Sequence, residues 1–398
     1  GTLEIVSDWL DKEIEMSWMR EYVEKSDCGL TVLQTSGDAV KTILFCEEQF
    51  LKGKNVRPQF PGRNVGMMFG LESSLHPFIG HPSYREIADL PLSERVKIMK
   101  DPAFKEKLLN EKPNFASEIE KSMNEQGNTK SQEEIKEAAN LGLKLISNYD
   151  TQFILGDPPN YEPGKEDSIA ALAKSKGIAE LEVIYDEFLK NEGTNLVYAC
   201  FTPYDNHKLD FVERAYSLKS SVAGGSDGGA HCGLICDASM PTTNLSHWAR
   251  DREAGKKIPI ELIVRKQTKD TAETYGLFDR GEIKTGMLAD LNIIDFEKLN
   301  VTHPKMVYDL PLGGRRLIQT SSGYLATVKS GEVVYEAGEA TGVLPGKLIR
   351  GKQTCEVKTE KERVPFIDRT LRLMSVKAFK LLWNFRKSSV KTTVVSDD

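Results

Sequence analysis

The chain contains short apolar runs that alternate with longer segments in which apolar residues recur every three to four positions. Runs of the first kind predict buried strands, and segments of the second kind predict helices. Strands are expected at residues 3–6, 30–33, 55–60, 195–201 and 221–225, and helices at residues 9–25, 39–50, 208–217 and 259–275. Strands that alternate with helices of this length are typical of βαβ units and a parallel sheet.

The polar residues that end these strands recur at a nearly constant spacing. Asp8, Gln34 and Gln59 are separated by 26 and 25 residues, and Phe201 precedes Asp227 by 26. One unit of a (β/α)8 barrel takes roughly 25–30 residues, because about 250 residues are shared among eight units. The spacing therefore predicts an α/β fold, a partial TIM-type (β/α)8 barrel with about five of its strands.

The period is interrupted once and then ends. Residues 63–190 have the pattern of a long helical insertion, and its charged stretch at 114–139 is expected to be exposed. We therefore predict the carboxyl-terminal part of a β/α barrel over 1–280, a small β-sandwich over 281–350, and a basic tail with an amphipathic helix over 351–398. The β segments expected after the barrel are residues 289–294, 316–320, 324–329 and 332–336.

Composition narrows the class of protein. The chain has 398 residues, of which 39% are hydrophobic and 28% charged, and its formal charge is −6. It has no apolar run of about 18 residues, so no transmembrane segment is predicted. The acidic balance disfavours nucleic acid, because phosphates are bound by clustered Lys and Arg. The six cysteines show no framework spacing, which predicts free thiols and a cytoplasmic protein.

Candidate chemistry is expected where the strands end, because barrels of this kind build their active sites at the carboxyl ends of the strands. Asp227 directly follows the strand at 221–225, among glycines at 224, 225, 228 and 229 that let the backbone approach a ligand closely. A carboxylate in this position fits a metal ligand or a general base toward a bound water. A carboxylate that only caps the turn fits the pattern equally well.

The residues around Asp227 resemble a known family. Residues 225–239 read Gly-Ser-Asp-Gly-Gly-Ala-His-Cys-Gly-Leu-Ile-Cys-Asp-Ala-Ser, which is similar to the last-strand motif of the amidohydrolase superfamily, in the N-acyl-D-amino-acid deacylase (D-aminoacylase) branch. Further blocks agree with this branch in order along the chain, at residues 57–59, 71–78, 80–86, 155–163, 265–272 and 286–295.

The resemblance implies a metal-dependent hydrolase of linear amide C–N bonds. Its substrate would be a small N-acyl-D-amino acid, and its cofactor Zn²⁺, with Asp227 as a metal ligand and as the proton shuttle to the leaving amine. The chemistry is consistent, because amide hydrolysis near neutral pH needs an acidified water and an acid for a poor leaving group. A homo-oligomer is compatible with the sequence.

The chain departs from the family pattern at its first strands. It contains no His-x-His, and the strand ends where other amidohydrolases place metal-binding histidines carry Gln34 and Gln59, whose neutral amides are poor zinc ligands. Because the visible strands number about five, we expect a fragment whose other zinc ligands lie upstream of Gly1. The alternatives are a cyclic amidase of the hydantoinase or dihydropyrimidinase type, and a non-catalytic barrel that acts in binding or assembly.

Further polar residues are candidates for the substrate pocket. His76 and His231 are expected to contact substrate, although His-Pro sequences such as 76–77 also punctuate turns. Arg250 is a candidate for a substrate carboxylate, which a planar guanidinium binds well; the alternative is a solvated helix face. For the basic tail, we expect docking on the protein's own body rather than on an acidic membrane.

Overall fold

In a computed structural model of the chain, the described residues are 1–6, 11–34, 40–115, 132–226, 228–229, 231–351 and 353. The chain forms two compact units. The first contains Gly1–Tyr275 and Phe296–Gly323, and the second contains Gly276–Asp295 and Tyr324–Asp398. The segment Phe296–Gly323 therefore groups with the first unit, whereas the sequence places it in the sandwich. The predicted domain boundaries themselves stay a prediction.

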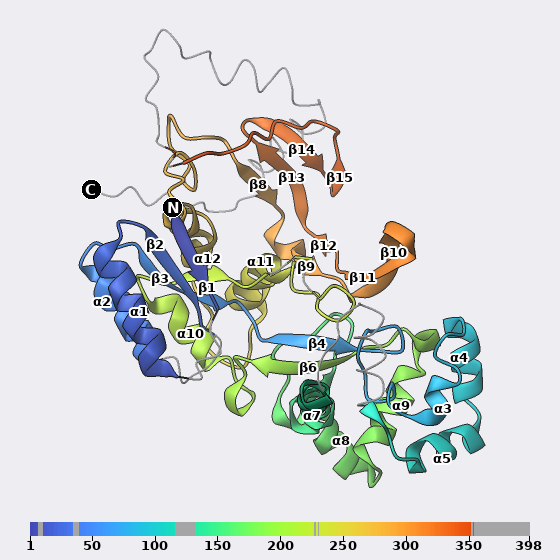
Figure 1. Cartoon of the computed structure of the whole chain (residues 1–398). Helices are drawn as coiled ribbons and strands as arrows, with labels where there is room; N and C mark the ends of the chain where they lie inside the picture. The colour runs from blue at the N-terminus through green and yellow to red at the C-terminus, as the bar shows by residue number, and fades with distance from the viewer. Residues whose placement is uncertain are drawn as a thin grey trace. The chain divides into compact units, whose positions relative to one another are not determined.

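The first unit contains a four-stranded parallel sheet, three of whose strands are labelled in Figure 1. Its strands are β1 (Thr2–Ile5), β2 (Gly29–Leu33), β3 (Val56–Pro61) and β7 (Val222–Gly224), in that spatial order. All three neighbouring pairs are parallel. The predicted fold class, a partial β/α barrel, is confirmed by this sheet and its helices.

Helices cover one face of this sheet. They are α1 (Lys12–Lys25), α2 (Val40–Leu51) and α10 (Asp210–Ser217). The helix α1 begins where the Asp11 carboxylate accepts hydrogen bonds from the backbone N–H groups of Glu13 and Ile14, both at 3.1 Å. The apolar faces of α1 and α2 meet the sheet in a cluster of Met16, Met19, Val23, Leu30, Val32, Phe45, Cys46 and Val56.

The strand predicted at 195–201 does not belong to the parallel sheet. It is β6 (Val197–Thr202), and it pairs in antiparallel fashion with β4 (Val65–Phe69) and β5 (Gln152–Ile154). The order of this second sheet is β4-β6-β5. Four rather than about five of the predicted barrel strands therefore lie in the parallel sheet.

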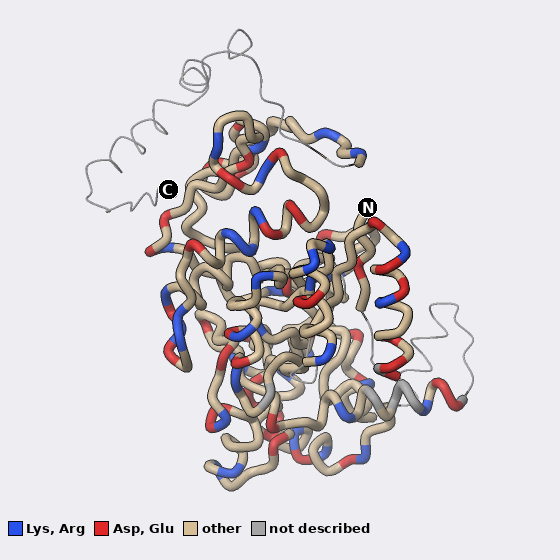
Figure 2. The backbone as a smooth tube through the Cα atoms, turned by 90° about the vertical axis from the view of Figure 1, so that its left-hand side faces the viewer, with Lys and Arg blue, Asp and Glu red and all other residues tan. Residues whose placement is uncertain are grey.

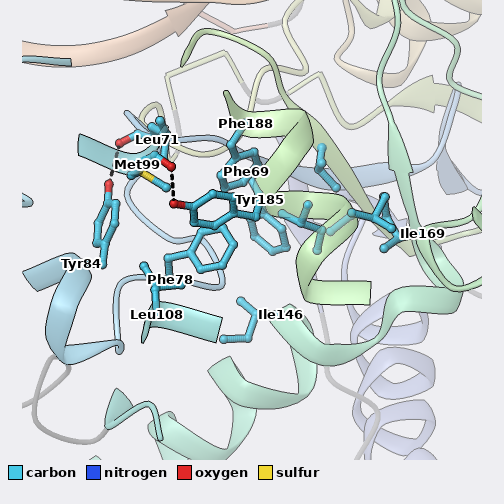
Figure 3. Close-up of a cluster of buried hydrophobic side chains, with 14 of the residues drawn as sticks. Phe69, Leu71, Phe78, Tyr84, Met99, Leu108, Ile146, Ile169, Tyr185 and Phe188 are labelled. Carbon is cyan, nitrogen blue, oxygen red and sulfur yellow. Dashed lines mark hydrogen bonds between the residues drawn. The ribbon is translucent and has the colours of Figure 1, made fainter. Parts of the chain in front are cut away.

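The insertion after β4 is mostly helical. Its helices are α3 (Pro82–Arg85), α4 (Leu92–Met99), α5 (Pro102–Asn110), α7 (Gln132–Ser147), α8 (Ile169–Lys176) and α9 (Glu180–Phe188). Most of the charged stretch at 114–139 lies outside the described residues. Aromatic side chains fill the core of the insertion (Figure 3), where the Tyr185 hydroxyl donates to the Met99 carbonyl at 2.6 Å.

After β7 the chain forms α11 (Met240–Thr243), a π-helix (Asn244–Asp251), α12 (Ile260–Gln267) and α13 (Lys269–Thr274). The single helix predicted at 259–275 is broken at Thr268, whose φ and ψ are −118° and −84°. The first unit also contains β9 (Asn300–Val301), β10 (Lys305–Leu310), β11 (Gly314–Ile318) and β12 (Ser321–Ser322). Short 3-10 turns lie at Tyr149–Thr151, Lys165–Asp167, Asn191–Gly193, Asp205–His207, Phe296–Lys298 and Pro311–Gly313.

The second unit contains a four-stranded antiparallel sheet of order β15-β14-β13-β8. Its strands are β8 (Leu291–Ile294), β13 (Tyr324–Lys329), β14 (Glu332–Glu336) and β15 (Glu339–Ala340), at or beside the predicted segments. A two-sheet sandwich stays a prediction. The tail, apart from residues 351 and 353, lies outside the described residues.

The charges, the hydropathy of the helices and the cysteines can be compared with the expectations from composition. Acidic and basic residues are interspersed along the backbone, as in α1 (Figure 2). Among the described residues, no helix is long and apolar enough to cross a membrane. The described cysteines 28, 46, 200, 232 and 236 are free, in line with the absence of framework spacing.

Candidate functional site

The carboxyl ends of β2, β3 and β7 lie side by side at one edge of the parallel sheet, since the strands are neighbours and parallel. Gln34 directly follows β2. Gln59 lies inside β3, which continues to Pro61, so the residues that follow this strand are Gly62 and Arg63. Asp227, the principal predicted site residue and predicted metal ligand, lies outside the described residues, as does Asp8.

Both glutamines at this edge are buried. The Gln34 side-chain amide donates to the Val32 carbonyl at 3.3 Å, and its Oε1 has no hydrogen-bond partner among the described residues. The Gln59 amide donates to the Thr31 hydroxyl at 2.8 Å, and its oxygen lies against Gly224 of β7, where an added Cβ would be 2.4 Å away. This edge of the sheet therefore presents two neutral amides. The Gln34 oxygen can still accept a hydrogen bond.

The turn after β7 is shaped by backbone that favours glycine. Gly225 and Gly229 have φ values of +77° and +104°, in the left-handed region. His231 has a φ of +45° and is exposed, and its carbonyl accepts hydrogen bonds from Leu234 and Ile235 at 2.8 and 2.9 Å. The His231 imidazole therefore lies at the surface four residues after Asp227.

His76 lies inside the core of the insertion. Its side chain is 1% exposed, its ring contacts Tyr84 and Phe188 edge-on at 4.8 and 5.9 Å, and its Nδ1 accepts the Phe78 N–H at 3.2 Å. Burial, with a smaller effect of Arg95, lowers the pKa of His76 to about 3, so the ring is neutral. This enclosure disagrees with the predicted contact to substrate and favours a role in packing.

Arg250 is occupied by the protein. Its guanidinium donates to both carboxylate oxygens of Asp251, at 2.6 and 2.8 Å, and to the Leu299 carbonyl at 2.7 Å and the Phe296 carbonyl. These hydrogen bonds connect residues 296–299 to the π-helix, which contains Arg250. The guanidinium of Arg250 thus binds groups of the protein, whereas the sequence predicts either a substrate carboxylate or a solvated helix face.

Sequence patterns did not indicate the most deeply buried charge at the sheet edge. Arg63 is fully buried, forms an ion pair with Asp237 at 3.0 Å, and donates to the Cys236 carbonyl at 3.0 Å. Its guanidinium lies 3.7 Å from the centre of the Tyr161 ring. Burial acts to lower the pKa of Arg63, but the neighbouring Tyr161 and Asp237 raise it above its ordinary value. This contact ties the end of the 225–239 motif to the end of β3.

A second buried charge network lies next to it. Arg252 donates to the Glu162 carboxylate at 3.0 Å and to Glu213 at 2.5 Å, and stacks on Trp248 at 4.3 Å. Glu162 also forms a 2.7 Å hydrogen bond with Nε2 of His247. Burial acts to raise the pKa of Glu162, but its bonds to His247 and Arg252 lower it, so the carboxylate is ionised.

The described residues do not fit a metal by themselves. Among them, no group of three or more His, Cys, Asp or Glu side chains is placed to hold an ion. At the sheet edge, the Asp237 carboxylate is paired with Arg63, and Gln34 and Gln59 present neutral amides. A neutral amide is a poor ligand for zinc.

The segment around β7 was compared with models of known protein families. Residues 160–335 match the model of the amidohydrolase family. This segment belongs to the amidohydrolases. The amidohydrolase segment includes β6, β7 and the turn that holds Asp227, and it ends in β14. The predicted superfamily is thereby confirmed. No curated protein matches the chain.

Several solved amidohydrolase structures are similar to the chain. A mutant D-aminoacylase in complex with copper chloride is 14% identical with a TM-score of 0.42, and covers 86% of this chain and 54% of its own. An N-acyl-D-glutamate deacylase from Bordetella bronchiseptica, complexed with zinc and a phosphonate inhibitor, is 14% identical with a TM-score of 0.39, and covers 87% and 53%. The chain thus spans about half the length of these structures.

Proposed function

We propose that this protein hydrolyses linear amide C–N bonds and deacylates N-acyl-D-amino acids or similar N-acyl compounds. The observation that supports this most strongly is the amidohydrolase segment, because it contains the parallel strand β7 and the turn that follows it. In barrels of this architecture, the carboxyl ends of the strands carry the catalytic groups. The deacylase branch rests on the resemblance of residues 225–239.

Asp227 is the proposed catalytic residue. It follows β7 by three positions, next to Gly225, whose φ of +77° turns the chain at the sheet edge. A carboxylate there would accept the proton of the attacking water and deliver it to the departing amine nitrogen. Such a transfer matters for an amide, because an amine is a poor leaving group until it is protonated.

Residues around Asp227 have supporting roles in the proposal. Arg63 holds Cys236 and Asp237 and so fixes the end of the motif in which Asp227 lies. His231 is an exposed residue of this motif and is retained as a proposed substrate contact. His76 and Arg250 are not retained, because one is enclosed by aromatic rings and the other is bonded to Asp251 and Leu299.

A divalent metal, zinc in the first instance, belongs to the proposal. When bound, such an ion lowers the pKa of a water from 15.7 toward about 7 and makes it a nucleophile. Asp227 is the proposed ligand within this chain, and the other ligands would be residues outside the described ones. We expect activity to fall after dialysis against a chelator and to return with added zinc. Activity that survives metal removal, with no metal found by elemental analysis, would contradict this part.

A substrate panel tests the proposed reaction. The purified protein would be assayed with N-acetyl-D-methionine, N-acetyl-L-methionine and the cyclic amide hydantoin, and release of amine or opening of the ring would be followed. We expect hydrolysis of the D compound, with a kcat/KM at least about tenfold above that of the other two. Preferential opening of hydantoin would establish the cyclic amidase instead.

One observation favours a non-catalytic barrel. The described sheet edge carries neutral amides and an arginine-paired aspartate where a metal-dependent hydrolase needs ionisable ligands. This second candidate predicts that none of the three compounds is turned over and that the purified protein contains only a trace of zinc. Turnover of any one of them excludes it.

A further inference from the structure

A cavity of about 430 Å³ lies in the first unit beside the π-helix. Three segments line it, and Figure 1 shows β9 and α11, which mark its place along the chain. The lining residues are 158–162, residues 243, 246, 247, 251, 253 and 254 of α11, the π-helix and the turn after it, and residues 300–301 of β9. π-helical turns are rare and recur at functional sites, so the groups that this one presents are of interest.

The π-helix presents His247 to the cavity with its orientation fixed. Nε2 of His247 lies 2.7 Å from the Glu162 carboxylate, which is ionised, so Nε2 carries the proton and donates. Glu162 is held in turn by Arg252, whose side chain is 1% exposed. None of the hydrogen bonds among the described residues uses Nδ1 of this ring, so Nδ1 is open to a ligand.

The charged residues around the cavity have one sign. Apart from His247, the charged side chains that line it are the carboxylates of Glu162, Asp251 and Glu253, and no Lys or Arg is among the lining residues. Arg252 balances Glu162, and Arg250 balances Asp251. Glu253 is exposed and forms no ion pair with a described residue, so its charge is open to a ligand.

Part of the cavity lining is held in place by contacts and by proline. Tyr161 is 4% exposed, with the Arg63 guanidinium stacked 3.7 Å from its ring centre and its hydroxyl bonded to the Gln319 amide at 2.9 Å. Pro158 and Pro159 add apolar surface with a fixed backbone. Acceptors together with a fixed, partly apolar lining suit a compact ligand that carries hydrogen-bond donors.

We propose that this cavity binds a small organic cation with a primary ammonium group and a second hydrogen-bond donor. The ammonium group pairs with Glu253, and the second donor binds Nδ1 of His247. Anions are disfavoured, because Glu253 carries a negative charge at the cavity that forms no ion pair with a described residue. This site is independent of the proposed hydrolysis at the sheet edge, so either proposal can fail without the other.

Binding is tested by isothermal titration calorimetry with three probes of equal length. They are 1,3-diaminopropane, which is cationic, 1,3-propanediol, which is neutral, and malonate, which is anionic. We expect saturable binding of the diamine alone, and weaker binding at high salt because the pairing is electrostatic. No heat with the diamine, or equal binding of malonate, overturns the proposal.

Two variants locate the binding. Glu253→Gln removes the open charge without removing an ion pair to a described residue, and should weaken diamine binding about fivefold. His247→Gln removes Nδ1 while its amide can still donate to Glu162, and should weaken binding to a similar extent. The control is Glu261→Gln on the exposed face of α12, which should bind like the unchanged protein.

The same experiment separates binding from a purely structural His247. If His247 serves only to hold residues 158–162 through Glu162, then diamine affinity is the same in His247→Gln as in the control, and the proposed contact to Nδ1 is wrong. Circular dichroism shows whether each variant is folded. If His247→Gln does not fold, the Glu253→Gln titration decides by itself.

Discussion

At the scale of single residues, buried charges at the sheet edge are neutralised by specific partners. Arg63 and Asp237 have side chains that are 0% and 2% exposed, and their nitrogen and oxygen are 3.0 Å apart. Sequence patterns did not find this pair, because its members are 174 positions apart and Arg63 lies in no motif for chemistry. The sequence predicts that His76 contacts substrate, because a sequence does not reveal that this side chain is buried.

Truncation of Arg63 tests the importance of the buried pair. Arg63→Ala removes the cation that is ion-paired with the buried Asp237 carboxylate, which costs about 3–5 kcal/mol of unfolding free energy. Denaturation in urea measures this loss. Arg214→Ala, on the exposed side of α10, is the control and should change stability by less than about 0.5 kcal/mol. Equal effects of the two changes would show that the pair contributes nothing.

His76 predicts a specific dependence of stability on pH. Its pKa is about 3 in the folded chain, against an ordinary value of 6.5, so below pH 6.5 the unfolded chain binds more protons. Stability from this residue is therefore complete above pH 6.5 and is lost as the pH falls toward 3, by up to about 2 kcal/mol between pH 7 and pH 5.

The comparison that isolates His76 uses a ring that cannot titrate. His76→Phe keeps an aromatic side chain beside Tyr84 and Phe188. Urea denaturation at pH 7 and pH 5 should show a smaller loss of stability in this variant than in the unchanged protein. The same loss in both would mean that His76 is not the group responsible.

At the scale of elements, periodicity predicted which segments form strands and helices but not which strands pair. The parallel strands β1, β2, β3 and β7 and the helices α1, α2 and α10 lie where the pattern placed them. β6 has four consecutive buried residues, which is typical of any central strand, parallel or antiparallel. Its pairing with β4 and β5 depends on the insertion, so the apolar run alone did not reveal it.

The contact between the end of β3 and the π-helix is the tightest at the sheet edge. A Cβ added at Gly62 would lie 1.6 Å from Oδ1 of the buried Asn244, and the Gly62 carbonyl accepts the Trp248 indole N–H at 2.6 Å. Gly62→Ala should therefore cost about 1–3 kcal/mol through overpacking. A lower melting temperature would be measured by calorimetry.

A matched glycine provides the control for that change. Gly346 has no atom within 4 Å of an added Cβ, so Gly346→Ala should leave the melting temperature nearly unchanged. If both variants melt at the temperature of the unchanged protein, then Gly62 and Asn244 are not in close contact.

At the scale of the whole molecule, the sequence predicted the family and the partial barrel but not a complete site. The family followed from the motif at 225–239, and residues 160–335 match the amidohydrolase model. The described residues bring His76, His231 and Arg250 to different surroundings rather than to one pocket. Contacts of that kind depend on the tertiary packing of distant segments, which spacing along the chain does not specify.

The central claim is that Asp227 moves the proton in amide hydrolysis. Its most direct test is the kcat for N-acetyl-D-methionine in Asp227→Asn, which keeps the size of the side chain but removes its basicity. Asp89→Asn, at an exposed position of the insertion, is the control. We predict a loss of about 10²–10⁴-fold in kcat for Asp227→Asn and none for the control. A kcat within a few-fold of the unchanged protein would contradict the account.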